Sequence, residues 1–497
     1  MNTPCRIIAM KRRAGSVPAL TLIILIVLIL AGCVTVGPDY IPPGTDLSKN
    51  WHTPLKDGLT AEEENPTVLA NWWTTLNDPE LSSLMKRAIT GNRDLKKAMA
   101  RVREARASRG VTLAGLFPTL DASGSAIRSQ SSEETGTGTT SSLYLAGLDA
   151  GWELDLFGGV RRSVEAAEAD LQASQEDLHD VLVSLVAEVA LNYADVRTYQ
   201  GRLNVAESNL ATQNETFELT QWRQQAGLSD ELAVQQARYN LESTRSQIPS
   251  LRTGLEAAKN NLAVLLGEQP GKIHGELEER KPIPVATPAV AVGVPADVLR
   301  QRPDVRRAER QLAAQTARIG VAKAELYPKF TLSGSIGLEA FSASNLFSSG
   351  SRVASGGAGI SWRIFDAGAI RQNIEVQTAL QEQYLLAYET AILSSLKEVE
   401  NALTAYAEEE LRRQALREAV RAAQQAAEQA GYKYQSGLAD FDSVLEAQRS
   451  LLTFQDELAQ SDGTVLANLI RLYKVLGGGW TSLAVSDEKQ ESSDLSK

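Results

Sequence analysis

The chain consists of two similar halves, and equivalent residues are separated by a constant 210 positions, as from Leu95 to Val305. The matched pairs run along the whole of each half: 116–118 with 326–328, 123–125 with 333–335, Trp152 with Trp362, 227–228 with 437–438, and 266–267 with 476–477. A unit of roughly 190 residues far exceeds the ~20–50-residue period of solenoid proteins. The sequence therefore predicts a pseudo-symmetric assembly of two similar halves.

The first 32 residues have the pattern of an export signal. Four basic residues precede an apolar stretch from Val17 to Leu30, which is short for a membrane helix and typical of a secretory signal. The sequence Leu-Ala-Gly-Cys that ends at Cys33 resembles a bacterial lipobox, in which the cysteine becomes the lipidated first residue. We expect Cys33 to carry N-acyl and S-diacylglycerol lipid, palmitate included; an ordinary signal peptide or anchor helix is the alternative. Val34 stands where a retention aspartate would be, which favours the outer membrane.

Composition excludes several classes of protein. The cysteines are Cys5 and Cys33, so the processed chain cannot form an internal disulfide. A formal charge of -11 provides no basic surface for nucleic acid. The three histidines are not spaced as metal ligands, and no Gly-rich phosphate loop follows a strand. We therefore expect no enzyme activity, no metal and no cofactor other than the lipid.

Each half contains a long helical hairpin. Good helix formers dominate after Gly158, and no proline occurs from 159 to 248. Apolar residues at alternating spacings of four and three predict a narrow coiled-coil seam, and these are Leu182, Val186, Val189, Tyr193 and Val196, with Ile392, Leu396, Val399, Leu403 and Tyr406 in the second half. Gly227 and Gly437 mark the expected tips. Pro249 should kink the return helix of the first half only.

Four segments alternate between apolar and polar residues at every second position, which is typical of strands. We place them at about 119–127, 143–157, 329–340 and 353–365. Their length matches transmembrane barrel strands, and Trp152 and Trp362 fit an interfacial aromatic belt. A soluble hairpin with one face on a core is the alternative. Four strands cannot close a barrel, and open edges are not tolerated in lipid, so spanning a membrane would require several chains.

Motifs in order along the mature chain resemble the outer-membrane factor (TolC-like) family, in its NodT/OprM/CusC-like lipoprotein branch. The most specific is Val-Pro-Ala-Asp-Val-Leu-Arg-Gln-Arg-Pro-Asp-Val-Arg-Arg-Ala-Glu at 294–309. The others are the segment 33–43, the Trp-Trp pair 72–73, and the segments 76–81, 437–449 and 476–480. The resemblance covers about 33–480.

The resemblance implies the fold class, the assembly and the function. The fold would be mostly α with a transmembrane β-barrel part, and a trimer would form a 12-stranded barrel continuous with a periplasmic α-helical tunnel. The chain would be the outer-membrane channel of a tripartite efflux system, a passive exit duct for toxic small molecules or ions such as those of multidrug resistance. Its partners would be a periplasmic adaptor (membrane fusion) protein, whose docking opens the duct, and an inner-membrane pump of the RND type.

The expected organisation follows the duplication. Residues 1–32 are the signal peptide, 33–75 the lipidated N-terminal segment, 76–267 the first repeat, 268–296 a Pro-rich linker, 297–480 the second repeat and 481–497 a polar tail. Two alternative functions stay open: the exit duct of a protein secretion system, and a periplasmic adaptor-type coiled-coil lipoprotein. The adaptor alternative is weakened by the four matched strands.

Acidic residues at the hairpin tips are the candidate functional residues. The resemblance places the second tip at the periplasmic entrance, where a trimer would repeat each carboxylate in a ring that favours cations. The candidates for the periplasmic gate are Asp440, Asp442, Glu446, Asp230, Glu231 and Tyr434. The alternative is that the carboxylates are solvated helix-start residues and that the tyrosine only packs.

Overall fold

The computed structural model describes residues 35–44, 48–55, 59–62, 66–284 and 290–480. The expected signal peptide, Cys33 and the polar tail lie outside these residues. The described chain falls into two compact units. Of the described residues, the first unit contains 35–42, 104–171 and 310–386. The second unit contains those within 43–103, 172–309 and 387–480.

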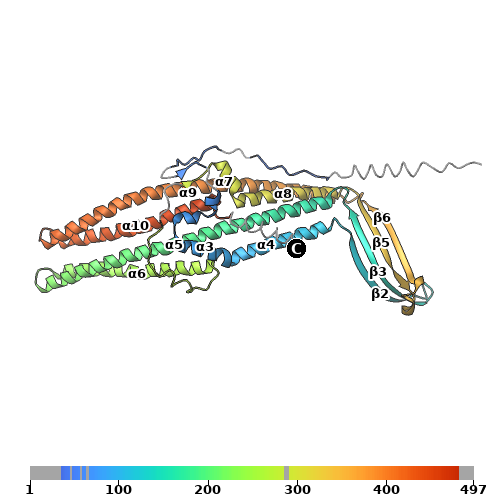
Figure 1. Ribbon diagram of the computed structural model, residues 1–497, viewed down its shortest axis with the longest axis horizontal. Coiled ribbons are helices and arrows are strands. Elements are labelled where there is room, and N and C mark those ends of the chain that lie inside the picture. Colours follow the sequence, from blue (N-terminus) through green and yellow to red (C-terminus); the bar gives the residue numbers. More distant parts are fainter. Residues whose placement is uncertain (1–34, 45–47, 56–58, 63–65, 285–289, 481–497) are drawn as a thin grey trace, which may run out of the picture. The chain divides into compact units, whose positions relative to one another are not determined.

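Helix boundaries repeat at the interval that the sequence predicts, and Figure 1 shows the matched helices in the two halves. The matched pairs are α4 (Arg93–Ala114) with α8 (Pro303–Ala324), α5 (Gly159–Gln225) with α9 (Ala369–Gln435), and α6 (Glu231–Leu265) with α10 (Phe441–Val475). Every start and end is displaced by 210 positions. The duplication is therefore confirmed at the level of secondary structure.

Four antiparallel strands form one sheet in the first unit (Figure 1). They are β2 (Thr119–Gln130), β3 (Thr140–Leu154), β5 (Lys329–Ala340) and β6 (Arg352–Ser361), hydrogen-bonded in the order β2-β3-β5-β6. β5 matches its predicted bounds, whereas β3 begins and ends three residues earlier than predicted. β6 ends at Ser361, so the prediction that Trp362 lies within a strand is wrong. Within the chain, β2 and β6 are the two edges of an open sheet.

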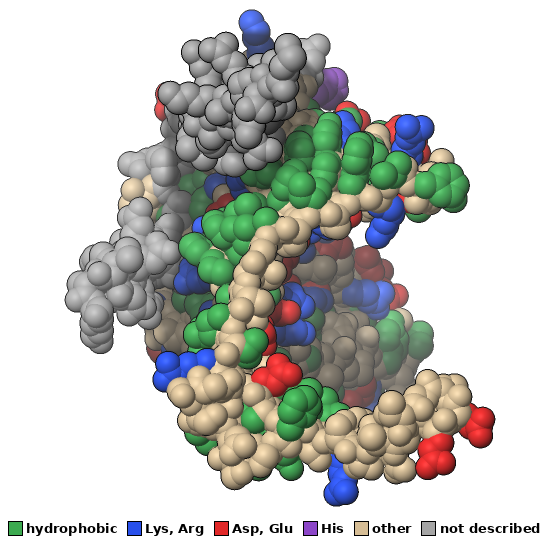
Figure 2. All heavy atoms as spheres, turned by 90° about the vertical axis from the view of Figure 1, so that its right-hand side faces the viewer, with side chains coloured by type: hydrophobic (Ala, Val, Ile, Leu, Met, Phe, Trp, Pro, Cys, Tyr) green, Lys and Arg blue, Asp and Glu red, His purple; other side chains and the backbone are tan. Residues whose placement is uncertain are grey.

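The register gives the sheet two different faces. Ala122, Leu148, Ile336 and Ala354 follow one another across the four strands on one face. The next row, on the opposite face, consists of Asp121, Asp149, Ser335 and Ser355. In Figure 2, hydrophobic side chains gather along the strands. The alternation of the sequence is thus realised as one apolar and one polar face, and much of each is exposed in the single chain.

The two tryptophans tie the sheet to the helices that precede it. Trp152 donates its indole N–H to the carbonyl oxygen of Leu116 at 3.0 Å, just beyond α4. Trp362 makes the same bond to Leu326, also at 3.0 Å, just beyond α8. Because both rings stay partly exposed, the bond leaves their apolar faces free. Each tryptophan therefore fixes the junction between a strand and a helix in its own half.

The core of the second unit is wider than a coiled-coil seam. Between 182 and 197, α5 buries side chains on most of its circumference, including Val183, Leu185 and Ala190 as well as the seam residues. The prediction of a narrow seam is therefore wrong here. The reason lies in the short segments near Trp72, whose ring stacks on Tyr473 at 5.1 Å and is buried. The seam of α9 is narrower, as predicted.

The remaining elements are short. They are β1 (Leu59–Thr60), α2 (Pro66–Ala70), the 3-10 helix η1 (Trp72–Leu76), α3 (Pro79–Gly91), β4 (Val290–Ala291), α7 (Pro295–Gln301), η2 (Ala343–Asn345) and η3 (Ser349–Ser351). β1 and β4 pair in parallel, so the Pro-rich segment between the halves returns to the N-terminal segment. Pro249 lies inside α6, which continues past it without ending. Among the described residues, no helix has the length and apolarity needed to cross a membrane.

Candidate functional site

The two hairpin tips share one backbone geometry. Gly227 and Gly437 have φ of 73° and 71°, a left-handed conformation that disfavours a side chain. Leu228 N–H bonds to the carbonyl of Arg223 at 2.8 Å, and the equivalent Leu438 bond is also 2.8 Å. These bonds satisfy carbonyls at the helix end, as in a Schellman motif. The predicted turns are therefore present at equivalent positions in both halves.

The starts of the return helices differ between the tips. Asp230 caps α6 by accepting the backbone N–H of Ala233 at 2.9 Å. Asp440 occupies the same position before α10, but its side chain makes no capping bond. Asp440 is exposed, as is Asp442 in the first turn. The first tip thus uses its aspartate as a helix cap, while the second leaves its carboxylates available to solvent or ions.

The other candidates are held by different contacts. Glu231 accepts a hydrogen bond from Gln235 at 2.6 Å on the surface of α6. Glu446 lies one turn from Arg449, with 3.5 Å between the carboxylate and the guanidinium. Both carboxylates are exposed. The structure therefore does not gather the six candidates into one cluster within a single chain.

An apolar contact joins the two hairpins just behind the tips. Ala233 and Ala237 of α6 pack with Phe441 and Leu445 of α10. The ring of Tyr434 packs on Phe441, with 5.3 Å between centroids. The guanidinium of Arg223 lies 4.6 Å from the same tyrosine ring, which is the geometry of a cation–π contact. Tyr434 therefore sits where the two hairpins meet.

Arg449 forms a second link between the hairpins. Its guanidinium donates to the hydroxyl of Tyr239 at 3.1 Å and to the side-chain oxygen of Asn240 at 3.3 Å, both on α6. It also lies 5.9 Å from the ring of Tyr239. Sequence reasoning did not single out any of these three residues. Their partners lie more than 200 positions away, so local spacing carries no signal for them.

A row of polar pairs connects α5 with α10 further from the tips. Arg202 makes two bonds to Asp456 at 2.8 and 2.9 Å, and this carboxylate raises the pKa of Arg202 although burial opposes it. Asn209 bonds to Gln455 at 2.8 Å. Gln448 donates to Thr216 at 2.9 Å. The α5 members recur every seven residues, so the heptad spacing of polar residues was a usable signal.

A polar cavity of about 290 Å³ lies among α5, α6 and α10 beside these contacts. Its lining includes Gln213, Asn240, Thr244 and Arg449. The side-chain oxygens of Gln213 and Gln448 and the amide nitrogen of Asn240 are buried without a protein hydrogen-bond partner. A buried polar atom left unpaired costs about 1–3 kcal/mol. The hairpin interface behind the tips is therefore incompletely bonded.

Metal binding finds no support among the described residues. They contain no group of three or more His, Cys, Asp or Glu side chains placed to hold an ion. His179 packs against Trp480 in a tilted arrangement with 4.6 Å between the ring centroids, and His274 contacts the carboxylate of Glu256 at 2.8 Å. Each of these contacts holds its histidine in place within the fold, as expected for a structural histidine.

Comparisons with known proteins agree with this architecture. Nodulation protein T of Rhizobium leguminosarum bv. trifolii is 34% identical, over 92% of this chain and 97% of that protein. The toluene efflux pump outer membrane protein TtgI of Pseudomonas putida is 32% identical, over 91% and 97%. The solved outer-membrane channel OprN has 36% identity and a TM-score of 0.84, over 90% of this chain and 99% of that one.

The profile of the family described as "Outer membrane efflux protein" matches twice, at residues 84–268 and 294–478, which are separated by the same 210 positions. The family, the outer-membrane location and the efflux role that the sequence predicts are confirmed by these matches, and the adaptor-type alternative is wrong. The chain belongs to the outer membrane efflux protein family and serves as the outer-membrane channel component of an efflux system.

Proposed function

We propose that three copies of this chain close a 12-stranded barrel that continues into a helical tunnel, forming a passive exit duct of a tripartite efflux system. The observation that carries this is the open four-stranded sheet with its unpaired edges on β2 and β6. In lipid those edges need partners, because unsatisfied backbone groups are very costly there. Joining β6 of one copy to β2 of the next satisfies them without any other protein.

The duct has no visible energy source of its own. The sequence contains no Gly-rich phosphate loop after a strand, and the described residues contain no cluster of metal-binding side chains. We assign energy coupling to an inner-membrane pump of the RND type and a periplasmic adaptor. The cargo would be toxic small molecules or ions, a class that includes the solvent and cation substrates named for relatives.

We place the gate at the hairpin tips. Asp440 and Asp442 are exposed carboxylates at the second tip that three copies would repeat in a ring, and the exposed Glu446 adds a third position close behind. The unpaired polar atoms behind the tips make this interface easier to separate than a fully bonded one. Docking of the adaptor would supply the remaining energy for opening.

We also propose that Cys33 carries the lipid and that the interfacial belt includes Trp152 and Trp362. A Cys33→Ser variant should accumulate unprocessed and should not incorporate labelled palmitate. Incorporation into that variant would show that the anchor is elsewhere.

The deciding experiment for the proposed function is a deletion strain tested for export. The strain should accumulate toxic compounds that the wild type exports, and the restored gene should reverse this. The tagged protein should co-purify with an adaptor and a pump after crosslinking. Undiminished export together with co-purification of secretion components would refute the efflux assignment.

A further inference from the structure

The apolar face of the sheet carries two charged side chains, and both are arginines. Arg128 lies on β2 and Arg352 on β6, at the end of each strand near the β2–β3 and β5–β6 loops. The register places them on the face of Ala126, Ala146 and Leu338, since Leu338 pairs directly with Arg352. The acidic residues of the described strands are on the other face, namely Asp121, Asp149, Glu153 and Glu339.

Neither arginine has an acidic partner among the described contacts. Arg128 is exposed opposite Ser142, and Arg352 is exposed beside Leu338. By contrast, Lys329 at the helix end of β5 pairs with Glu325 at 2.7 Å. The chain thus compensates a cation at one end of the sheet but leaves two uncompensated at the other.

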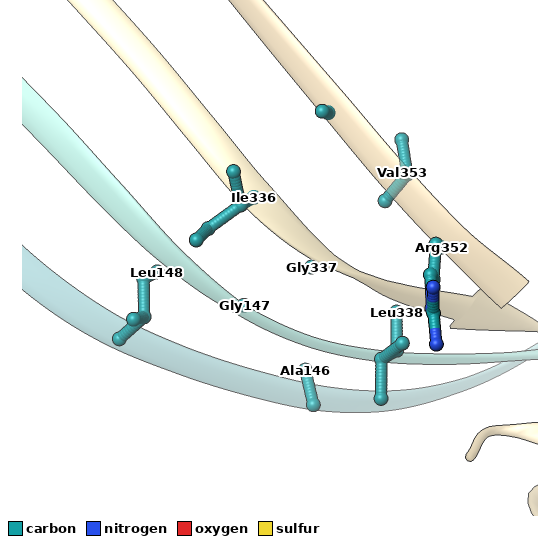
Figure 3. A pocket seen from close by; sticks show the side chains of 9 residues that line it. Ala146, Gly147, Leu148, Ile336, Gly337, Leu338, Arg352 and Val353 are labelled. Carbon is teal, nitrogen blue, oxygen red and sulfur yellow. The ribbon is translucent and has the colours of Figure 1, made fainter. Parts of the chain in front are cut away.

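Arg352 also borders an apolar groove on the sheet. The groove has a volume of about 570 Å³ and is lined by Ala146, Leu148, Ile336 and Leu338. Figure 3 shows the side chains of Leu338 and Arg352 extending to the same side of the strands. A guanidinium at the end of an apolar groove matches a molecule with an acyl chain and an anionic head.

An arginine on a lipid-facing surface is unfavourable at the centre of the bilayer and tolerable near its edge. There its aliphatic stem can lie on apolar surface while the planar guanidinium binds phosphate with two parallel hydrogen bonds. The loop end of the sheet is the end away from the helices, which on the proposed duct faces the outside of the cell. The phosphates within reach are then those of the outer leaflet.

We infer that Arg128 and Arg352 bind the phosphate groups of outer-leaflet lipopolysaccharide, with acyl chains along the groove. This inference rests on the proposed barrel. Arg128 and Arg352 lie on the two edge strands, so joining β6 of one copy to β2 of the next brings both onto one seam. A closed barrel of three copies has three such seams, and each presents arginines from two copies to the lipid.

The test measures lipid binding by the full-length protein purified in a neutral detergent. The probes are bisphosphorylated lipid A, the same lipid A without phosphate, and phosphatidylglycerol. Native mass spectrometry should show that the wild type prefers the phosphorylated form by about tenfold, since charge-assisted bidentate bonds are lost without phosphate. The double variant Arg128→Gln/Arg352→Gln should lose this preference, and the control Lys329→Gln should keep it.

Equal binding of the two lipid A forms by the wild type would overturn the inference, and so would an unchanged preference in the double variant. Phosphatidylglycerol bound as tightly as lipid A would overturn the assignment to lipopolysaccharide. If the double variant does not assemble, two measurements decide the outcome. These are the preference of the wild type for phosphorylated over unphosphorylated lipid A, and the reduction of that preference in each single variant. The masses of the same preparations also report how many copies assemble, so a trimer without phosphate preference refutes this inference and leaves the duct standing, whereas a preparation without trimers refutes the duct.

Discussion

The link that Arg449 makes between the hairpins should govern how easily the tips separate. It consists of bonds of 3.1 and 3.3 Å to Tyr239 and Asn240 on α6. Hydrogen bonds to a charged group contribute about 1.5–3 kcal/mol when buried. The Arg449 side chain is 47% exposed, so we discount this to about 1.4 kcal/mol per chain. That corresponds to about tenfold in the ratio of open to closed tips for one chain.

Three copies that open together would combine this effect to about 4 kcal/mol, or roughly a thousandfold. Replacement by alanine (Arg449→Ala) should therefore raise the open probability of the purified channel in a planar bilayer. Arg421→Ala is the matched control, because Arg421 is exposed and its ion pair among the described residues lies within α9, with Glu418 at 2.6 Å. An open probability in Arg449→Ala equal to that of the control would refute the role of this link.

Three further predictions concern stability and selectivity. Gly437→Ala should lower the free energy of unfolding by about 1 kcal/mol because φ is 71° there, whereas Gly431→Ala inside α9 should raise the melting temperature. Burial opposes ionisation of Asp304, but the hydrogen bond and charge of Arg302 outweigh it and hold its pKa below 3.8. The ionised carboxylate of Asp304 therefore stabilises the folded state fully above pH 3.8, and this stabilisation is lost as the pH falls through the lower pKa of the folded state. The loss of melting temperature caused by Asp304→Asn should accordingly become smaller in acid. Asp440→Asn together with Asp442→Asn should reduce the cation preference of the channel, measured as a reversal potential in a salt gradient; an unchanged potential would remove both from the gate.

The fold could be predicted because its signals are periodic and occur twice. The matched glycines at 227 and 437 fixed both tips, and the alternation in 329–340 located β5 to the residue. Strand ends were less predictable where alternation continues beyond the hydrogen bonds. Trp362 continues the pattern of β6, but Ser361 already pairs with Lys329, the first residue of β5, and the preceding Pro328 has no backbone N–H to extend the ladder.

The candidate site was less accessible to sequence reasoning. The tip carboxylates could be found because they follow the turn glycines directly. Arg449 and Asn240 could not, because their proximity depends on how two hairpins pack, and an arginine at an exposed helical position is unremarkable in sequence. The unpaired atoms of Gln213 and Gln448 likewise become visible only when the interface is assembled.

The number of copies in the assembled protein tests the central claim most directly. The four-stranded sheet with two open edges predicts a closed ring of three chains. Native mass spectrometry of the processed protein released from detergent should therefore give a mass three times that of one chain. A folded monomer or dimer that still conducts in a bilayer would contradict the account.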